Sequence, residues 1–476
     1  MEPRVLNPKP VTSLADYLAT GGGRGLDVAR RLGPIGIIDH VEASGLRGRG
    51  GAGFSTGLKW RTVAENLSVT VPPTVVINAA EGEPGTFKDR AILRRNPYKV
   101  LEGALVAATA IGADRVIVAL KASFTAEVAR MRSAIAEVSG RDWADELELV
   151  IVEGPSHYLY GEETALLEVV AGRAPFPRIA PPFRHGVDEV GADTVSAAQV
   201  TMASETNPTS APPTLVNNVE TLANVPGILA EGPDWYRSVG TPESPGTIVC
   251  TITGRTRRHG VAEFAMGTPL REVIEAVGGG PAPGTRVVAA MSGVANPLLP
   301  EDLLDTPLTY EAMEAAGAGL GSAGFIVFDD TTDLVAVAAG VSRFLAVESC
   351  GQCTPCKQDG ATLADLLDRL RTSTADETDL GLIEDKLATV ADSARCYLAT
   401  QHQRVVESVL ALFPDQVRAH AAREVGEAAP ELIAAILDLE DERAVLDERH
   451  RDKQPDWTFD EVDSGQAPAD RIDQRA

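Results

Sequence analysis

The sequence has no run of eighteen or more apolar residues, the length at which a membrane-spanning helix becomes possible. Its first ten residues, MEPRVLNPKP, contain no apolar core and predict no secretory signal. Positive charge is scarce, with 43 Lys and Arg against 68 Asp and Glu and a formal net charge of −25. Because so acidic a chain repels nucleic acids and anionic membranes, neither is an expected partner. We therefore expect a cytoplasmic protein with no direct membrane insertion, which a partner could place at the periphery of a membrane complex.

Cysteine is rare and unevenly placed, since only five occur and none precedes residue 250. The stretch ESCGQCTPC contains Cys350, Cys353 and Cys356, and Cys396 follows forty positions later. This distribution excludes a secreted disulfide scaffold. Three closely spaced cysteines and a remote fourth suit a [4Fe–4S] cube, with zinc as the alternative, although structural zinc sites usually have two separated CxxC pairs. Cys250 stands alone in an apolar strand pattern and is expected in the core.

With 476 residues, the chain has room for two to four domains. Its first half alternates helix-like and strand-like segments, which predicts an α/β sheet covered by helices. The helices are expected within residues 11–46, 100–113 and 126–140, and the strands near 74–79, 114–120 and 147–154.

The pattern changes twice along the remaining chain. Residues 186–212 are small, polar and without a period, so we expect a loop. From residue 246 the order is strand, strand and helix, with Thr268 expected as the helix cap. Residues 333–423 are expected to be helical. The tail from 431 to 476 carries fourteen Asp and Glu against six Lys and Arg, and its last twenty or so residues are expected to be disordered.

The stretch GLRGRGGAGF contains a G-x-G-x-x-G pattern at Gly48, Gly50 and Gly53. A Rossmann fingerprint requires a buried strand before the glycines, but the preceding IIDHVEASGLR is helix-like and polar. A flexible surface loop is a second alternative. We favour a different phosphate cradle, in which glycines let backbone N–H groups approach an anion. Nearby cations and rings would suit a nucleotide or flavin, namely Arg47, Arg49, Lys59, Phe54 and Trp60.

Five ordered motifs carry a family resemblance over about residues 12–425: SGLRGRGGAGFSTGLKW, NAAEGEPGTFKDR, YGEETALLEVVAGR, PTLVNNVETLANVP and ESCGQCTPC. Together they resemble the NADH-binding flavoprotein (large diaphorase) subunit of respiratory complex I and of NAD-linked hydrogenases and formate dehydrogenases. The resemblance implies a Rossmann-like FMN- and NADH-binding α/β domain over residues 1–240. A β-grasp (soluble-ligand-binding) module over 246–328 and a helical [4Fe–4S] domain over 333–425 would follow, before the acidic tail at 431–476.

The resemblance also implies an activity, that of an NADH dehydrogenase subunit in which FMN takes hydride from NADH and passes electrons to the [4Fe–4S] cluster. No histidine is expected to be essential. Glu83 and Glu163 are the candidate catalytic residues, and Glu83 would contact the dinucleotide. The flavin phosphate side would be held by Gly48, Arg49, Gly50, Gly51, Gly53 and Lys59. The rest of the cofactor site would comprise Phe54, Asn78, Glu81, Tyr158, Gly161, Glu162, Phe183, Asn217, Asn218 and Thr221. The cluster ligands would be Cys350, Cys353, Cys356 and Cys396.

The sequence departs from the family pattern at three places. Ala80 stands where the family usually has aspartate, Ala180 where it has lysine, and Thr62 lies in a stretch that often holds an aromatic residue. These departures leave open a flavin and iron–sulfur protein with a non-nicotinamide donor or acceptor such as a ferredoxin, and a structural subunit without flavin. The family's thioredoxin-like [2Fe–2S] subunit must be a separate chain, so such a subunit, or a ferredoxin-type protein, is the expected partner. The chain could then belong to a larger redox complex.

Overall fold

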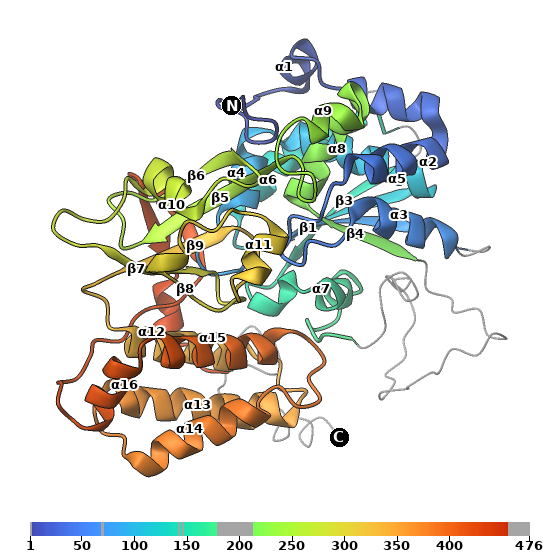
Figure 1. The fold of residues 1–476 in the computed structure, drawn as a ribbon. Helices are drawn as coiled ribbons and strands as arrows, with labels where there is room; N and C mark the ends of the chain where they lie inside the picture. The colour runs from blue at the N-terminus through green and yellow to red at the C-terminus, as the bar shows by residue number, and fades with distance from the viewer. Residues whose placement is uncertain (1, 68–70, 141–142, 145–146, 179–212, 456–476) are drawn as a thin grey trace, which may run out of the picture. The chain divides into compact units, whose positions relative to one another are not determined.

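The computed structural model describes residues 2–67, 71–140, 143–144, 147–178 and 213–455 (Figure 1). The chain divides into two compact units. The first comprises Met1–Glu81, Asp89–Ser156 and Tyr160–Thr247, and the second comprises Gly82–Lys88, His157–Leu159 and Ile248–Ala476. In the part of the chain described, no helix is long and apolar enough to cross a membrane.

A four-stranded parallel sheet forms the centre of the first unit, in the order β3-β2-β1-β4. The strands are β1 (Thr74–Ala79), β2 (Arg115–Lys121), β3 (Glu148–Gly154) and β4 (Thr214–Asn218). The three strands expected from the apolar pattern are present, so the predicted α/β architecture is confirmed. The register places Asn78 of β1 beside Asn218 of β4 at the carboxyl ends of both strands.

Helices cover both faces of this sheet. On one face α2 (Arg24–Ser44), α5 (Pro97–Ile111) and α8 (Val219–Glu231) pack together, while α7 (Glu163–Val170) packs on the side chains of the other face. Helices α5 and α8 approach closely at Gly103, which has no side chain. A Cβ at this position would lie 2.0 Å from the Leu222 carbonyl oxygen, so no larger residue would fit. The other helices of this part of the chain are α1 (Leu14–Ala19), α3 (Thr56–Glu65), α4 (Lys88–Arg95), α6 (Thr125–Ser139), η1 (Tyr158–Gly161) and α9 (Pro233–Arg237).

A five-stranded mixed sheet, in the order β6-β5-β9-β7-β8, opens the second unit. Its strands are β5 (Thr247–Gly254), β6 (Gly260–Ala265), β7 (Val287–Ser292), β8 (Leu299–Pro300) and β9 (Gly324–Asp329). The sheet packs with α10 (Leu270–Val273), which continues into the π turn η2 (Ile274–Gly278), and with η3 (Glu301–Leu303) and α11 (Tyr310–Ala315). Cys250 is fully buried in this core, as predicted.

The predicted cap of α10 is wrong. Pro269 occupies the N-cap position, and no side chain caps the helix. The Thr268 hydroxyl instead donates to the Ala265 carbonyl at 2.9 Å, because the turn from β6 brings that carbonyl closer than the helix amides.

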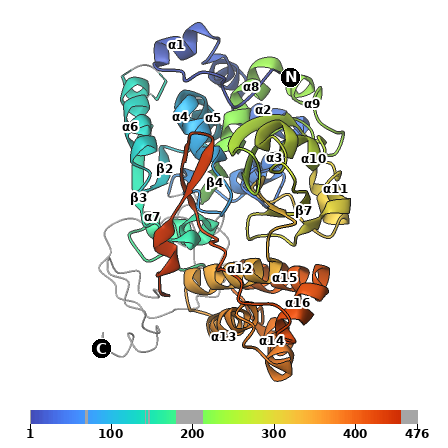
Figure 2. The same cartoon turned by 90° about the vertical axis from the view of Figure 1, so that its left-hand side faces the viewer.

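Five helices continue the second unit and lie side by side in both views (Figures 1 and 2). They are α12 (Leu334–Glu348), α13 (Thr354–Arg371), α14 (Glu377–Thr389), α15 (Leu398–Leu412) and α16 (Pro414–Ala421), which confirms the predicted helical region. The acidic tail then contains an unforeseen hairpin, β10 (Ile436–Glu440) and β11 (Arg443–Leu446), and the short turn η4 (Glu448–Arg451), shown in red in Figure 2. The expected 186–212 loop and the expected disorder of the last residues lie outside the residues described.

Candidate functional site

The glycine-rich loop connects α2 to α3 in the first unit, and helix precedes it where a Rossmann fold would have a strand. The loop is closed by its own hydrogen bonds: Arg47 Nε donates to the Gly53 carbonyl at 2.7 Å, and Gly48 N donates to the Phe54 carbonyl at 2.8 Å. Gly51 and Gly53 have φ of 134° and 63°, conformations that favour glycine. These bonds argue against a flexible loop and support a shaped backbone turn of the kind that binds anions.

Arg49 anchors this loop within the first unit. Its buried guanidinium donates to the Thr247 carbonyl at 3.1 Å, the Pro245 carbonyl at 3.2 Å and the Tyr236 hydroxyl at 3.0 Å. Its backbone N–H donates to Thr221 Oγ1 at 2.8 Å. The structure therefore gives this side chain partners other than the phosphate that the sequence suggested, because the chain folds these acceptors around it.

Lys59 supplies a partly exposed positive charge on α3, the helix that follows the glycine loop. It projects from α3 and lies 2.6 Å from Glu163, the first residue of α7. The neighbouring Glu162 caps the same helix by accepting from the amides of Thr164 and Ala165 at 3.0 and 2.7 Å. Burial raises the pKa of Glu162, and these donors act in the opposite direction. Of the two adjacent glutamates, Glu162 thus caps α7, and Glu163 forms the ion pair with Lys59.

Three asparagines gather at the carboxyl ends of β1 and β4. Asn78 Nδ2 donates to the Gly161 carbonyl at 2.9 Å, and Asn217 Oδ1 accepts from the indole of buried Trp60 at 2.7 Å. A Cβ on Gly50 would lie 3.2 Å from Asn218 Cβ, so the glycine loop passes close to this sheet edge. The same edge of a parallel sheet is where ligands commonly bind.

Glu81 follows β1 and is buried. Its carboxylate lies 3.2 Å from Arg90 Nε and accepts from Asp89 N at 2.9 Å. Burial lowers the pKa of Arg90, and the carboxylate of Glu81 opposes that effect. This ion pair holds the chain after β1, the segment in which the sequence placed flavin contacts.

The donor set of the first unit fits FMN. A backbone turn with glycines at positive φ and Lys59 suits the phosphate, and the asparagine amides suit the polar edge of a ring system. Phe54 is 55% exposed at the end of the loop, where it is available to a flat ligand. Phe183 lies outside the described residues.

Glu83 and Tyr158 form a separate group in the second unit. The Tyr158 hydroxyl donates to Glu83 Oε2 at 2.6 Å, and Val294 N donates to Glu83 Oε1 at 2.6 Å. Burial raises the pKa of Glu83 to about 7, although both hydrogen bonds act to lower it. Burial and the Glu83 charge raise the pKa of Tyr158 well above its ordinary value, and Gln401 Nε2 donates to the same hydroxyl at 3.1 Å. The phenol therefore remains protonated and fixes the carboxylate.

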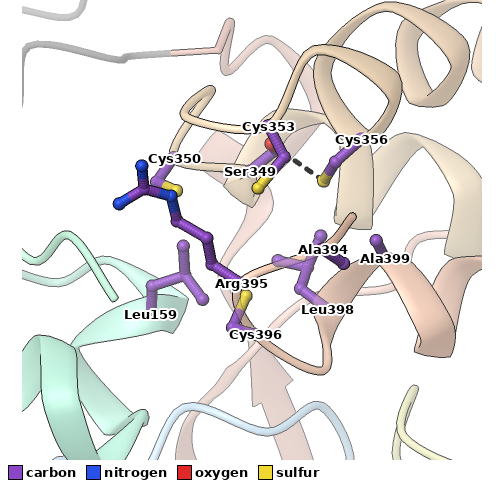
Figure 3. A pocket seen from close by; sticks show the side chains of 10 residues that line it. All are labelled: Leu159, Ser349, Cys350, Cys353, Cys356, Ala394, Arg395, Cys396, Leu398 and Ala399. Atoms are coloured by element: carbon purple, nitrogen blue, oxygen red, sulfur yellow. Dashed lines mark hydrogen bonds between the residues drawn. The ribbon is translucent and has the colours of Figure 1, made fainter. Parts of the chain in front are cut away.

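The four predicted cluster cysteines line one pocket in the second unit (Figure 3). Cys350, Cys353 and Cys356 come from the loop before α13 and its first turn, and Cys396 comes from the segment just before α15. Figure 3 shows the two stretches facing each other across the pocket. Sequence spacing thus identified all four residues, which tertiary packing brings together.

Four cysteine side chains around one pocket suit a cluster with several iron atoms, because a cube takes one sulfur ligand at each of its four corners. Burial raises the pKa of Cys356 to about 11, so a free side chain here is a thiol and iron must displace its proton.

Two side chains beside the sulfurs were not predicted from the sequence. Ser349 Oγ lies 3.4 Å from Cys356 Sγ, and Gln352 Nε2 donates to Cys350 Sγ at 3.5 Å. Arg395 Nη1 in turn donates to Gln352 Oε1 at 3.1 Å. Their position inside the cysteine motifs was a signal, but only the fold shows that these side chains turn toward sulfur or its neighbours.

Two family models match the chain. Residues 41–227 match the Nuo51 FMN-binding domain, and residues 336–420 match the NADH-ubiquinone oxidoreductase-F iron–sulfur binding region. The first covers the glycine loop and the sheet edge, and the second covers the four-cysteine pocket. The zinc alternative is therefore rejected in favour of a [4Fe–4S] cluster.

Whole-chain relatives extend this similarity. The chain is 37% identical to an F subunit of the NADH-quinone oxidoreductase of Rhizobium meliloti, over 86% of this chain and 94% of that protein. It is 35% identical to the F subunit of the NADH-quinone oxidoreductase of Mycobacterium tuberculosis, over 84% and 87%. Among solved structures it resembles a chain of an NAD⁺-reducing [NiFe]-hydrogenase in the H₂-reduced state, with a TM-score of 0.74, 32% identity and coverage of 88% of this chain and 67% of that chain.

Proposed function

Since this chain belongs to the family of NADH-quinone oxidoreductase F subunits, we propose a division of labour between its two units in NADH oxidation. The protein binds FMN and a [4Fe–4S] cluster and acts as the NADH-oxidising part of an electron-transfer system. The first unit holds FMN, and the second holds the cluster and the Glu83 group that faces the dinucleotide. The observation that carries this proposal is that one chain combines the FMN-binding region with a complete four-cysteine pocket.

FMN, when bound, supplies the conversion from two-electron hydride chemistry to one-electron transfer. The protein contributes binding and orientation. The glycine turn and Lys59 hold the phosphate side, and Glu163 keeps the lysine side chain in place. Asn78, whose amide is fixed by Gly161, offers polar atoms to the flavin edge. Arg49 and Glu162 position the backbone instead of contacting the cofactor.

The roles of Glu83 and Tyr158 follow from their hydrogen bond. Tyr158 donates to Glu83 at 2.6 Å, which orients the carboxyl, while burial raises its pKa to about 7, so that protonated and ionised forms coexist near neutral pH. A neutral carboxyl donates a hydrogen bond to a dinucleotide and does not repel its diphosphate. The proposed catalysis rests on stacking and orientation of the two rings, and no acid or base is assigned to hydride transfer.

The electron-accepting partner is proposed to be a thioredoxin-like [2Fe–2S] subunit or a ferredoxin-type protein. Tyr397, the residue after the cluster ligand Cys396, is 48% exposed, and Arg404 donates to its hydroxyl at 2.9 Å. Arg395 on the other side is also exposed. This small basic and aromatic surface beside the cluster suits an acidic iron–sulfur partner. The charge-reversal variant Arg395→Glu should slow reduction of that partner without slowing ferricyanide reduction, and equal effects on both acceptors would refute the surface.

The decisive experiment is an anaerobic titration of the cluster-loaded, FMN-loaded chain with NADH and then NADPH, followed by flavin absorbance. Stoichiometric bleaching by NADH is the expected result. Protein from which FMN has been removed is the control for absorbance changes of the cluster itself. Bound flavin that neither nucleotide reduces, but that a reduced ferredoxin does reduce, would support the alternative donor suggested by Ala80 and Ala180. A chain that binds no flavin would support a structural subunit.

The boundaries of the three domains and the acidic tail are part of the proposal. The β-grasp module at 246–328 and the helical domain at 333–425 both lie in the second unit. Besides the expected loop at 186–212, limited proteolysis of the holoprotein should cut near residues 240–246 and after 425, and cuts within the five-stranded sheet would contradict these boundaries.

A further inference from the structure

A buried carboxylate lies next to the cluster loop. Glu348 ends α12, two residues before Cys350, and is 6% exposed. Its Oε2 accepts from the backbone N–H of Tyr158 at 2.9 Å. A lone ionised carboxylate would be costly here and would disfavour electrons on a neighbouring cluster, because reduction adds negative charge. A positive charge that pairs with Glu348 would therefore make reduction of the neighbouring cluster easier.

Lys453 provides that counter-charge from far along the chain. Its Nζ lies 2.7 Å from Glu348 Oε1, and His450 Nε2 lies 3.3 Å from the same oxygen. The Lys453 and Glu348 side chains are only 22% and 5% exposed, so the two opposite charges form an ion pair that is largely shielded from solvent.

The lysine is delivered by the C-terminal segment, residues 431–455, which lies beyond the family match that ends at residue 420. This segment is held at several points in the second unit. Arg443 Nη1 donates to the Thr256 carbonyl at 3.0 Å, and Arg343 Nη2 donates to the Arg451 carbonyl at 2.7 Å. The segment therefore places Lys453 in a defined position and does not present it as a freely moving side chain.

An aromatic contact fixes the same junction. The His450 ring stacks on Phe344 of α12, with centroids 4.9 Å apart and planes inclined by 26°. Phe344 also meets Tyr158 edge to face at 5.3 Å. Side chains of the C-terminal segment, of α12 and of Tyr158 thus pack against one another.

We propose that Lys453 is a positioning residue of the redox site, which neutralises Glu348 beside the cluster loop and thereby raises the reduction potential of the [4Fe–4S] cluster. The proposal rests on the function above only in that the cluster occupies the four-cysteine pocket. The step concerned is uptake of one electron by the cluster, with dithionite as the electron source in the test. By Coulomb's law with an effective dielectric constant of about 20, one unit charge roughly 10–15 Å from a redox centre changes such an equilibrium about tenfold.

The test is an anaerobic redox titration of the full-length, cluster-loaded protein, with the reduced cluster quantified by electron paramagnetic resonance. Lys453→Met should lower the ratio of reduced to oxidised cluster about tenfold at a fixed potential. Glu348→Gln should raise it, and the double variant should return it close to the wild-type value. Lys453→Arg should keep the wild-type ratio. If Lys453 and Glu348 only supported the fold, the two single variants would not change the ratio of reduced to oxidised cluster in opposite directions, and the double variant would not restore it.

Arg449→Gln is the matched control, because it removes one positive charge from the same segment at a residue whose side chain is 74% exposed and paired with Asp447. It should leave the ratio unchanged. Equal ratios for wild type and Lys453→Met, or an equal fall in Arg449→Gln, would overturn the proposal. Iron content is measured on every sample: iron missing from the wild type would count against the cluster site itself. If only Lys453→Met loses iron, the proposal is tested by the other two variants: a raised ratio of reduced to oxidised cluster in Glu348→Gln and a wild-type ratio in the double variant support it, and any other result overturns it.

Discussion

The protonation of Glu83 near neutral pH can be tested by the substitution Glu83→Gln. The carboxyl accepts hydrogen bonds from Tyr158 and from the backbone N–H of Val294, both at 2.6 Å. Burial is the largest influence and raises its pKa to about 7 from an ordinary 4.5. Glutamine has nearly the same shape but cannot ionise, so it isolates the contribution of the charge.

The sign follows from proton binding. Between pH 4.5 and 7 the folded protein holds a proton on Glu83 that the unfolded chain has lost. Stability from this proton is fully present below pH 4.5 and is lost as the pH rises through 7. At 1.36 kcal/mol per pKa unit, the complete loss is about 3 kcal/mol, of which about 2 kcal/mol falls between pH 5.5 and 8.5.

The assay is urea unfolding of the full chain followed by circular dichroism, for wild type and Glu83→Gln at several pH values. The difference between their unfolding free energies should change by about 2 kcal/mol from pH 5.5 to 8.5, with the wild type losing more. Tyr158→Phe is the companion variant. Since the Tyr158 hydroxyl lowers the pKa of Glu83, its removal should move the transition to higher pH.

Parallel stability curves for wild type and Glu83→Gln would refute this reasoning, because they would mean that Glu83 has the same pKa in both states. A functional consequence follows from the same charge. The KM for NADH should rise as the pH increases through 7 in the wild type, since an ionised Glu83 repels the diphosphate, and should change less in Glu83→Gln.

Three further predictions concern the cofactor sites. Cys356→Ser should abolish the [4Fe–4S] cluster, and a variant that still carried four irons per chain would refute the ligand assignment. Asn217→Leu should lower the free energy of unfolding by about 1–3 kcal/mol in urea titrations, because buried Trp60 loses the acceptor of its indole N–H; an unchanged midpoint would contradict this. Lys59→Met should weaken FMN binding at least about tenfold in fluorescence titrations, and Glu163→Gln should weaken it by less, because the lysine loses the partner that holds it in place; unchanged binding in Lys59→Met, or tighter binding in Glu163→Gln, would refute these roles.

Local patterns in the sequence were reliable where the structure depends on neighbouring residues. The alternation of apolar strands and helices predicted β1, β2 and β3, and the helix-like segment before Gly48 excluded a Rossmann turn. The spacing of the cysteines predicted that they share one site, and all four line one pocket, because a short loop can present three sulfurs to one cube. In each case the chemistry is set by residues a few positions apart.

Side-chain partners were less predictable. The positive charge of Arg49 suggested a phosphate contact, yet its donors meet carbonyls of residues almost two hundred positions later. Thr268 has the residue type of a helix cap but bonds backward to Ala265. No pattern in the sequence indicated the hairpin that residues 436–446 form in the acidic tail.

The sequence by itself therefore determined the fold class through its periodicity, and its ordered motifs carried the family resemblance from which the cofactors followed. Only the tertiary structure decided which charges face one another. Lys453 and Glu348 are 105 positions apart and form an ion pair because the C-terminal segment folds back onto α12. The physical reason is that a buried charge takes its partner from whatever the packed chain brings within a few ångströms, and no local pattern records that choice.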